Sequence, residues 1–228
     1  MAQAKAAEVD VVGMPKGGTS KTRLAMFMAL LLAEKRKERV LYIEGDTVSQ
    51  TGSYWFKDAK RSGIELPIEL ERHPFTDIDE LIDEKAGEFD RIVCDIGGGN
   101  VPVFHSALTR AHKLLVPIGA DPSEVRNLAG AWKAARAAAA ESVTGGFDSW
   151  VVLSRTDRSS SLRREYRQIL TAGEWQGQKL PVYPLTETEL VRRVAYQRAY
   201  GRMPKDFLDV PRLLVEVGIA KKGELDAC

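Results

Sequence analysis

A short run near the amino end has the residue types of a phosphate-binding loop. Residues 14–22 read Met-Pro-Lys-Gly-Gly-Thr-Ser-Lys-Thr. Glycines let backbone N–H groups come close to phosphate oxygens, and a following helix points its N-terminus at them. At this spacing Lys21 would reach the β- and γ-phosphates, and the Thr22 hydroxyl would ligate Mg²⁺. The same string also fits an ordinary glycine turn with a helix cap, so the surrounding elements must decide between the two interpretations.

Two carboxylates follow later apolar runs, at positions suited to a metal ion or a water molecule. Asp46 comes shortly after the run 41–43, and Asp95 ends the run 91–94. In a parallel sheet, a carboxylate beyond the carboxyl end of a strand faces the same crevice as a phosphate loop. Asp95 would hold Mg²⁺ through water, and the glycines at 97–99 would let the backbone move with the γ-phosphate. For Asp46, a solvated turn remains the alternative.

Short apolar runs alternate with helix-like segments along the chain, which predicts the elements that position these residues. We expect strands at 9–13, 39–43, 68–70, 91–94, 113–118, 150–153 and 180–183, and helices at 22–37, 76–88, 122–141, 160–172, 187–200 and 204–217. Repeated strand–helix–strand units are typical of an α/β fold with a mainly parallel twisted sheet and helices on both faces. We expect a single domain over residues 1–228.

Composition favours a globular cytoplasmic protein. The 228 residues are 44% hydrophobic and 29% charged, with a formal net charge of +1. Cys94 lies in an apolar run and Cys228 ends the sequence, so the two cysteines do not suggest a disulfide framework. No signal-peptide pattern is present, and the longest apolar stretch, 24–33, is too short to span a bilayer.

The carboxy-terminal third is basic. Residues 151–222 contain 14 Lys and Arg against 8 Asp and Glu. In a basic helical portion at about 187–222, arginines stand among apolar residues and would neutralise DNA phosphates without reading sequence. The candidate DNA-binding residues are Arg192, Arg193, Arg198 and Arg202. A solvated helix with its tyrosines packed inward is the alternative.

The loop also carries a family resemblance. Lys16 to Thr22 resembles the deviant Walker A motif of the ParA/MinD family of P-loop ATPases, Lys-Gly-Gly-x-Gly-Lys-Thr/Ser. The resemblance implies a P-loop NTPase fold, and it implies that Lys16 reaches across an ATP-sandwich dimer to the partner's nucleotide, where a second cation offsets phosphate charge. Ser20 departs from the motif by replacing a glycine. We expect nucleotide binding to survive this change more readily than fast hydrolysis.

The resemblance extends to later segments. The run ending in Glu44-Gly45-Asp46 is similar to the family's Asp-x-Asp-Pro-Gln, which implies that Asp46 positions water or the metal shell. Residues 151–158 resemble the strand and loop that meet the adenine, which implies a nucleotide contact from Asp157, although a plain turn role stays open. The implied nucleotide-binding residues are Lys16, Gly17, Gly18, Thr19, Ser20, Lys21, Thr22, Arg23 and Asp157. The implied catalytic residues are Lys16, Lys21 and Asp46, and the implied metal ligands are Thr22, Asp46 and Asp95.

These patterns predict a slow ParA-like ATPase that uses ATP and Mg²⁺ as a dimerisation switch in plasmid or chromosome partition. Its expected partners are a second copy of the chain, non-specific DNA and an adaptor or activator protein. The alternative is a nucleotide-binding scaffold that hydrolyses little and positions a protein, as at a membrane in the MinD branch, through apolar tail residues at 213–219. A small-molecule kinase is a third candidate, but the sequence lacks an obvious acceptor lid.

Overall fold

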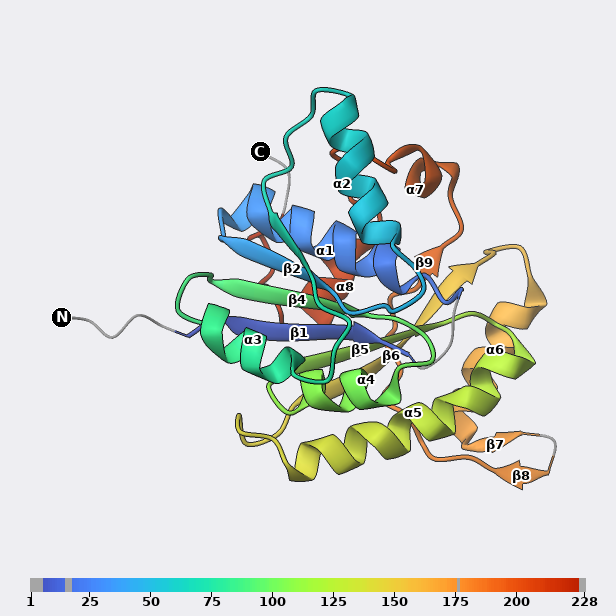
Figure 1. Ribbon diagram of the computed structural model, residues 1–228. Coiled ribbons are helices and arrows are strands. Elements are labelled where there is room, and N and C mark those ends of the chain that lie inside the picture. The colour runs from blue at the N-terminus through green and yellow to red at the C-terminus, as the bar shows by residue number, and fades with distance from the viewer. Residues whose placement is uncertain (1–5, 15–17, 176, 226–228) are drawn as a thin grey trace.

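A seven-stranded parallel sheet forms the centre of the computed structural model, which describes residues 6–14, 18–175 and 177–225. The strand order is β3-β2-β4-β1-β5-β6-β9 (Figure 1). The strands are β1 (Glu8–Gly13), β2 (Val40–Glu44), β3 (Glu69–Arg72), β4 (Arg91–Ile96), β5 (Lys113–Ile118), β6 (Asp148–Thr156) and β9 (Leu190–Val191). Every neighbouring pair is parallel, so all carboxyl ends lie at one edge. The strand order changes direction at β1, where open α/β sheets bind ligands.

Helices cover both faces of the sheet (Figure 1). The helices of one face are α1 (Lys21–Arg36), α2 (Thr51–Arg61), α7 (Val194–Arg198) and α8 (Val210–Glu216). The other face carries α3 (Ile78–Lys85), α4 (Val101–Leu108), α5 (Pro122–Ala140) and α6 (Ser161–Ala172). Two apolar clusters therefore sandwich the sheet, which confirms the predicted α/β architecture. Among the described residues, no helix combines the length and apolarity needed to cross a bilayer.

The central strands and α1 are buried almost completely. Residues 24–32 of α1 are each at most 1% exposed, and β4 is buried along its whole length. A helix apolar on all sides must lie inside a layered core rather than at its surface. This burial fixes α1 beside β1, so the loop between them lies at the carboxyl edge of the sheet.

The structure contains two helices, α2 and α4, that the sequence patterns do not predict. Helix α2 has a glycine and a serine in its first turn, and Trp55 and Ala59 are its buried apolar side chains, with Phe56 packed against the same cluster. Helix α4 follows three glycines and has a proline at its start. In both cases the helix depends on packing against its neighbours, because local propensity alone does not specify it.

The expected strand at 180–183 is wrong. These residues join no strand, and β7 (Glu174–Trp175) and β8 (Gln178–Lys179) form a small antiparallel hairpin before them. Prolines at 181 and 184 lack the N–H groups that a ladder needs. The last helix is also shorter than expected: it begins at Val210, just after Leu208 adopts a left-handed φ of 58°.

Candidate nucleotide site

The phosphate loop joins the end of β1 to the start of α1. Pro15, Lys16 and Gly17 lie outside the described residues, so the expected role of Lys16 and Gly17 stays a prediction. Gly18 and Ser20 both have left-handed backbone conformations, with φ of 79° and 71°. A residue with a Cβ loses roughly 1 kcal/mol in this region relative to its preferred conformations. The backbone geometry therefore explains why a glycine suits the position that Ser20 occupies.

The first turn of α1 brings a cation and a hydroxyl to the edge of the sheet. Lys21 is 6% exposed, and its Nζ lies 3.5 Å from Oγ1 of Thr19. Burial lowers the pKa of Lys21, although Asp95 and Asp46 act in the opposite direction. The Thr22 side chain lies beside Asp95 and acts to lower the pKa of that carboxyl. These contacts bring Lys21 and Thr22 together with the two predicted carboxylates.

Asp95 projects from the buried strand beside β1. Its Oδ2 accepts a hydrogen bond of 2.8 Å from the Tyr42 hydroxyl, while its buried Oδ1 has no hydrogen-bond partner among the described residues. Burial raises the pKa of Asp95 to about 6, although the nearby Thr22 and Tyr42 side chains oppose the rise. A buried carboxylate oxygen without a donor, next to a threonine hydroxyl, fits a Mg²⁺ ion held through water.

The turn after β2 holds two carboxylates with different partners. The Asp46 side chain packs against Gly97, where an added Cβ would overlap its carboxylate. Its Oδ1 accepts from the backbone N–H groups of Val48 and Ser49, at 2.8 and 2.9 Å. A glycine at position 97 therefore lets the backbone lie against the Asp46 side chain. This is a second reason for the glycine, besides the expected movement of residues 97–99 with the γ-phosphate.

Glu44 is buried and acts locally. Its carboxylate accepts from the backbone N–H groups of Gly52 at 2.8 Å and Ser53 at 3.2 Å, and also from the Ser53 hydroxyl. These are N–H groups of the first turn of α2, which have no partner within the helix. Glu44 therefore caps α2 and holds that helix beside the loop.

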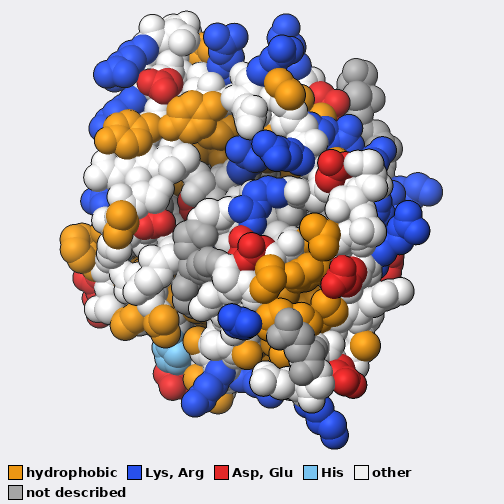
Figure 2. Space-filling view, turned by 90° about the vertical axis from the view of Figure 1, so that its right-hand side faces the viewer, with side chains coloured by type: hydrophobic (Ala, Val, Ile, Leu, Met, Phe, Trp, Pro, Cys, Tyr) orange, Lys and Arg blue, Asp and Glu red, His pale blue; other side chains and the backbone are white. Residues whose placement is uncertain are grey.

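A cavity of about 420 Å³ lies over the loop. It is lined by Gly18, Thr19, Ser20, Lys21, Thr22, Arg23, Asp46, Ser49, Thr51, Trp55, Tyr196, Gln197 and Tyr200. Figure 2 views this side of the molecule and shows Lys and Arg side chains across its centre and upper part, with acidic side chains scattered among them. The structure thus collects the described residues of the predicted loop, together with Asp46, around one opening.

A second cavity of about 520 Å³ begins at Arg23 and extends toward β6 and α6. Asp157 lines it, but its Oδ1 accepts from the N–H and hydroxyl of Ser159, at 2.9 and 2.7 Å. These bonds lower the pKa of Asp157. Asp157 therefore stabilises its own turn. Because it also lines this cavity, its contact with the nucleotide stays a prediction.

A larger cavity does not coincide with this chemistry. It has a volume of about 750 Å³ and lies between α2 and β3, with apolar walls that include Phe56, Ile64 and Leu66. None of the predicted phosphate or metal residues lines it. We therefore place the site at the smaller cavity, because convergent polar groups identify a reactive site better than volume does.

Sequence reasoning missed two residues of β6 that reach the loop. Ser154 donates to the carbonyl of Thr19 at 3.1 Å, and Arg155 donates to the carbonyl of Gly18 at 2.6 Å. Arg155 also pairs with the buried carboxylate of Glu124 in α5. No local pattern could have shown these contacts, because more than 130 residues separate the partners.

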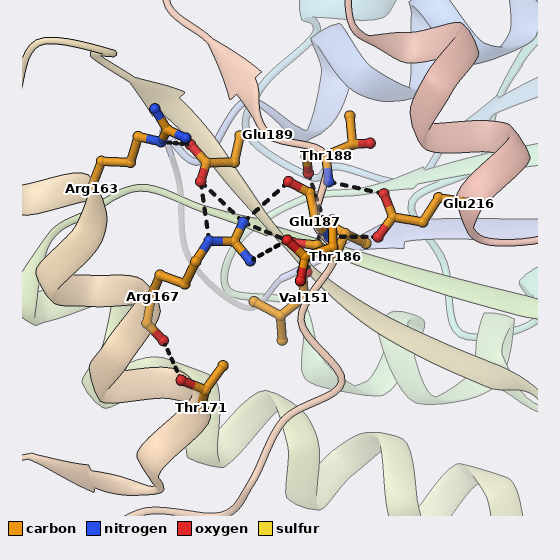
Figure 3. Close-up of polar contacts among 9 residues, drawn as sticks. All are labelled: Val151, Arg163, Arg167, Thr171, Thr186, Glu187, Thr188, Glu189 and Glu216. Atoms are coloured by element: carbon orange, nitrogen blue, oxygen red, sulfur yellow. Dashed lines mark hydrogen bonds and ion pairs between the residues drawn. The ribbon is translucent and has the colours of Figure 1, made fainter.

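The predicted helix at 187–200 is wrong, and Figure 3 shows why. Arg167 of α6 donates to the carbonyl of Thr186 at 2.9 Å and pairs with Glu189 at 3.0 Å. The Glu216 carboxylate of α8 accepts from the backbone N–H groups of Glu187 and Thr188. These bonds hold the segment extended as it approaches β9, so only the five residues of α7 become helical.

The four candidate DNA-binding arginines consequently do not share one helix face. Arg192 is exposed and lines the second cavity, whereas Arg193 pairs with Asp209 at 2.9 Å. Arg198 and Arg202 are exposed around a hollow of about 380 Å³, together with Lys205. Arg198, Arg202 and Lys205 therefore form the basic group of this region.

The apolar tail residues offered for a membrane-surface helix are buried. Leu213 and Leu214 are not exposed, and Val217 and Ile219 are 2% and 6% exposed. The Ile219 carbonyl accepts from Arg36 of α1 at 2.8 Å. In this structure the tail packs against the core, which removes these side chains from any membrane contact.

Comparisons with known proteins agree with this architecture. No protein-family model and no curated protein sequence matches the chain. Among solved structures, a plasmid partition protein from Borrelia burgdorferi aligns with a TM-score of 0.64 at 15% identity, over 92% of this chain and 99% of its own. A McdA variant from Cyanothece in complex with ATP aligns with a TM-score of 0.67 at 15% identity, over 96% and 98%.

A third similar structure belongs to an enzyme of a different kind. Cobyrinic acid a,c-diamide synthase from Mycobacterium smegmatis, with bound ADP and magnesium, aligns with a TM-score of 0.67 at 14% identity, covering 92% of this chain and 94% of that protein. At such identities the likeness concerns the fold and not the reaction. The chain therefore has the α/β fold of the P-loop NTPases, which it shares with these partition proteins and with the synthase.

Proposed function

We propose that the chain is an ATPase of the ParA/MinD family that uses ATP and Mg²⁺ as a dimerisation switch in DNA partition. The observation that carries this proposal is that Lys21, Thr22 and Asp46 line one cavity, with the buried Asp95 acting on Lys21 from behind it, beside a loop with left-handed backbone positions. The likeness to a plasmid partition protein along almost the whole chain supports the partition role. Because one alignment covers both chains almost completely, we also infer a single domain. Titration with ATP and a steady-state hydrolysis assay test it directly.

In the proposed site each residue has a physical task. Backbone N–H groups of the loop and Lys21 bind the phosphates, and the Thr22 hydroxyl and Asp95 hold Mg²⁺, Asp95 through water. When bound, Mg²⁺ supplies positive charge that neutralises the phosphate oxygens. We assign Asp46 to orient the attacking water, and its partly exposed side chain at the same cavity supports this assignment.

No group of three or more His, Cys, Asp or Glu residues in the described ranges could hold a metal ion alone. The proposed ligands, the Thr22 hydroxyl and the Asp95 carboxylate, suit Mg²⁺, which usually keeps several waters and binds through one or two protein oxygens plus phosphates. The proposed magnesium site is therefore formed jointly with the nucleotide. Weak Mg²⁺ binding without nucleotide is expected, and calorimetry with and without ADP measures the difference.

The dimer proposal rests on the family resemblance at Lys16. Lys16→Ala should preserve nucleotide binding by the monomer and weaken the ATP-bound dimer. Sedimentation with a slowly hydrolysed ATP analogue tests this, and a wild-type protein that stays monomeric would contradict the sandwich model.

DNA binding is proposed for the basic group Arg198, Arg202 and Lys205. Replacing all three with Ala should weaken binding to any duplex, and the log–log salt slope should become shallower by about 0.9 for each lost phosphate contact. Replacing Arg192, Arg193 and Arg198 should have a smaller effect, because Arg193 is held by Asp209. A matched control replaces Lys37, Arg39 and Lys85, which lie toward the amino ends of the strands.

A nucleotide-binding scaffold remains the second candidate because Ser20 places a Cβ and hydroxyl in the loop at φ 71°. Such a protein would bind ATP and hydrolyse it at a negligible rate. Measuring ATPase activity with and without DNA separates the two functions. Stimulation by DNA supports the partition ATPase, whereas tight ATP binding without turnover in either condition supports the scaffold.

A further inference from the structure

A phosphate loop must direct its N–H groups at the ligand, which leaves its carbonyl groups facing the protein. In a trans peptide the C=O of one residue and the N–H of the next point in opposite directions. Donors that fix the carbonyls therefore also fix the directions of the N–H groups. Here both donors come from β6: the Ser154 hydroxyl to the Thr19 carbonyl at 3.1 Å and the Arg155 guanidinium to the Gly18 carbonyl at 2.6 Å.

The local backbone of β6 is adapted to this contact. Arg155 has a left-handed φ of 56°, and the pairing of β6 with β9 is irregular between Ser154 and Thr156. Such irregularities redirect side chains next to functional sites. Because a non-glycine residue is strained in this conformation, the surrounding contacts must hold Arg155 there.

The other end of the Arg155 guanidinium is held as well. It pairs with Glu124, which is 5% exposed, and the second Glu124 oxygen accepts from the Gly119 N–H at 2.6 Å. An added Cβ at Gly119 would come within 2.5 Å of Nη2 of Arg155. The guanidinium therefore lies in a fitted position between the loop and the start of α5.

We propose that Ser154 and Arg155 are positioning residues for phosphate binding: they hold the carbonyls of Thr19 and Gly18 so that the N–H groups of Ser20 and Thr19 point toward the ligand. This inference rests on the proposed nucleotide site. It assigns these two residues to the phosphates, whereas the family resemblance of their segment implies the adenine. If the residues serve the phosphates, substituting them should lower the affinity for any ligand that carries the phosphates. If they contact the adenine, only ligands with a base should bind more weakly.

The test compares two ligands, ADP and inorganic pyrophosphate, by calorimetry with Mg²⁺ on the full chain. Ser154→Ala and Arg155→Met should each lower the affinity for both ligands by the same factor, about three- to tenfold for a lost hydrogen bond. Ser154→Thr and Arg155→Lys, which keep a donor, should restore most of the affinity. Arg164→Met is the matched control, because Arg164 of α6 is exposed, lines neither cavity and should affect neither ligand.

The outcomes distinguish this inference from the proposed function. Wild-type protein that binds neither ligand would refute the nucleotide site itself. Wild-type binding with unchanged affinities in both variants would overturn only the positioning role. A loss for ADP with unchanged pyrophosphate affinity would also overturn it, in favour of contact with the base. Arg155→Met leaves the buried carboxylate of Glu124 without its cation, so a loss of affinity in that variant has two causes. Ser154→Ala disturbs no buried charge, and its affinities therefore test the positioning role directly.

Discussion

Two buried aspartates on neighbouring strands show how differently this fold uses the same side chain. Asp10 of β1 and Asp95 of β4 are each 1% exposed, and burial raises the pKa of both. Asp10 pairs with the guanidinium of Arg91, which also bonds to Glu38 at 2.7 Å. Asp95 instead faces the phosphate loop, where its polar neighbours are hydroxyl groups, a lysine and the buried carboxylate of Glu44.

The pKa values of the cations beside these two aspartates, Arg91 and Lys21, shift in opposite directions. Burial opposes the charge on Arg91, but Asp10 and Glu38 raise its pKa overall. Burial lowers the pKa of Lys21, and its nearby carboxylates only partly offset this. Removing one partner of a buried ion pair is costly to the fold, whereas a partly desolvated lysine beside an open cavity is suited to an incoming anion. The comparison therefore separates a structural ion cluster from the candidate site.

The largest effect should come from breaking the structural ion cluster. Arg91→Met leaves the buried carboxylate of Asp10 without its cation, which should cost about 3–5 kcal/mol of unfolding free energy. Urea denaturation measures the loss, and the double variant with Asp10→Asn should recover part of it. ADP affinity of the folded variant should be unchanged. A loss below about 1 kcal/mol would contradict the structural role of this cluster.

Removing the cation of the open site should affect binding rather than folding. Lys21→Ala should weaken ATP binding by about 100-fold or more, because a charge-assisted contact to the phosphates is lost. The unfolding free energy should change little. Titration calorimetry checks the affinity, with Lys35→Ala on the same helix as control. Unchanged ATP affinity in the Lys21 variant would refute the P-loop assignment.

The pH dependence of stability should reveal Asp95 in the ligand-free protein. Its pKa is about 6 in the folded state, against an ordinary value of 3.8 for an aspartate in the unfolded chain, so folding takes up a proton between these values. Stability should therefore rise as pH falls from 7.5 to 5, by about 1 kcal/mol from this group. Asp95→Asn should remove that increment while the contribution of Asp10 stays. Denaturant curves at both pH values, with a chelator present, give the comparison, and identical pH slopes would argue against a perturbed Asp95.

The smallest effect should follow from Ser20→Gly. Glycine adopts the observed φ of 71° without strain but loses more entropy on folding, so stability should change by no more than about 0.5 kcal/mol. Hydrolysis should stay equal or rise by a few-fold, because phosphate can approach the loop more closely. A steady-state ATPase assay decides, and a large loss of activity would assign Ser20 a positive role in the reaction.

Local sequence patterns were sufficient for the elements around β1. The apolar run at 9–13, the glycine-rich loop and the long apolar helix follow directly from residue types, and the structure places them as β1, the loop and α1. Asp46 and Asp95 could be placed at the same edge because strands in a parallel sheet end together. The extended segment before β9 could not be predicted, since the bonds from Arg167 and Glu216 come from residues 19 and 28 positions away. Helix α2 was also missed, because a carboxylate eight residues earlier, Glu44, caps its first turn from the end of a buried strand.

The sequence by itself thus determined the phosphate loop, its lysine and threonine, and the alternation that leads to a parallel sheet. The tertiary structure alone decided which side chains support that loop. Ser154 and Arg155 meet it because β5 lies between β1 and β6 in the sheet, which brings the ends of all three strands to one edge. The physical reason is range: hydrophobic periodicity reports the neighbours of a residue along the chain, whereas strand order brings together residues that no periodicity connects.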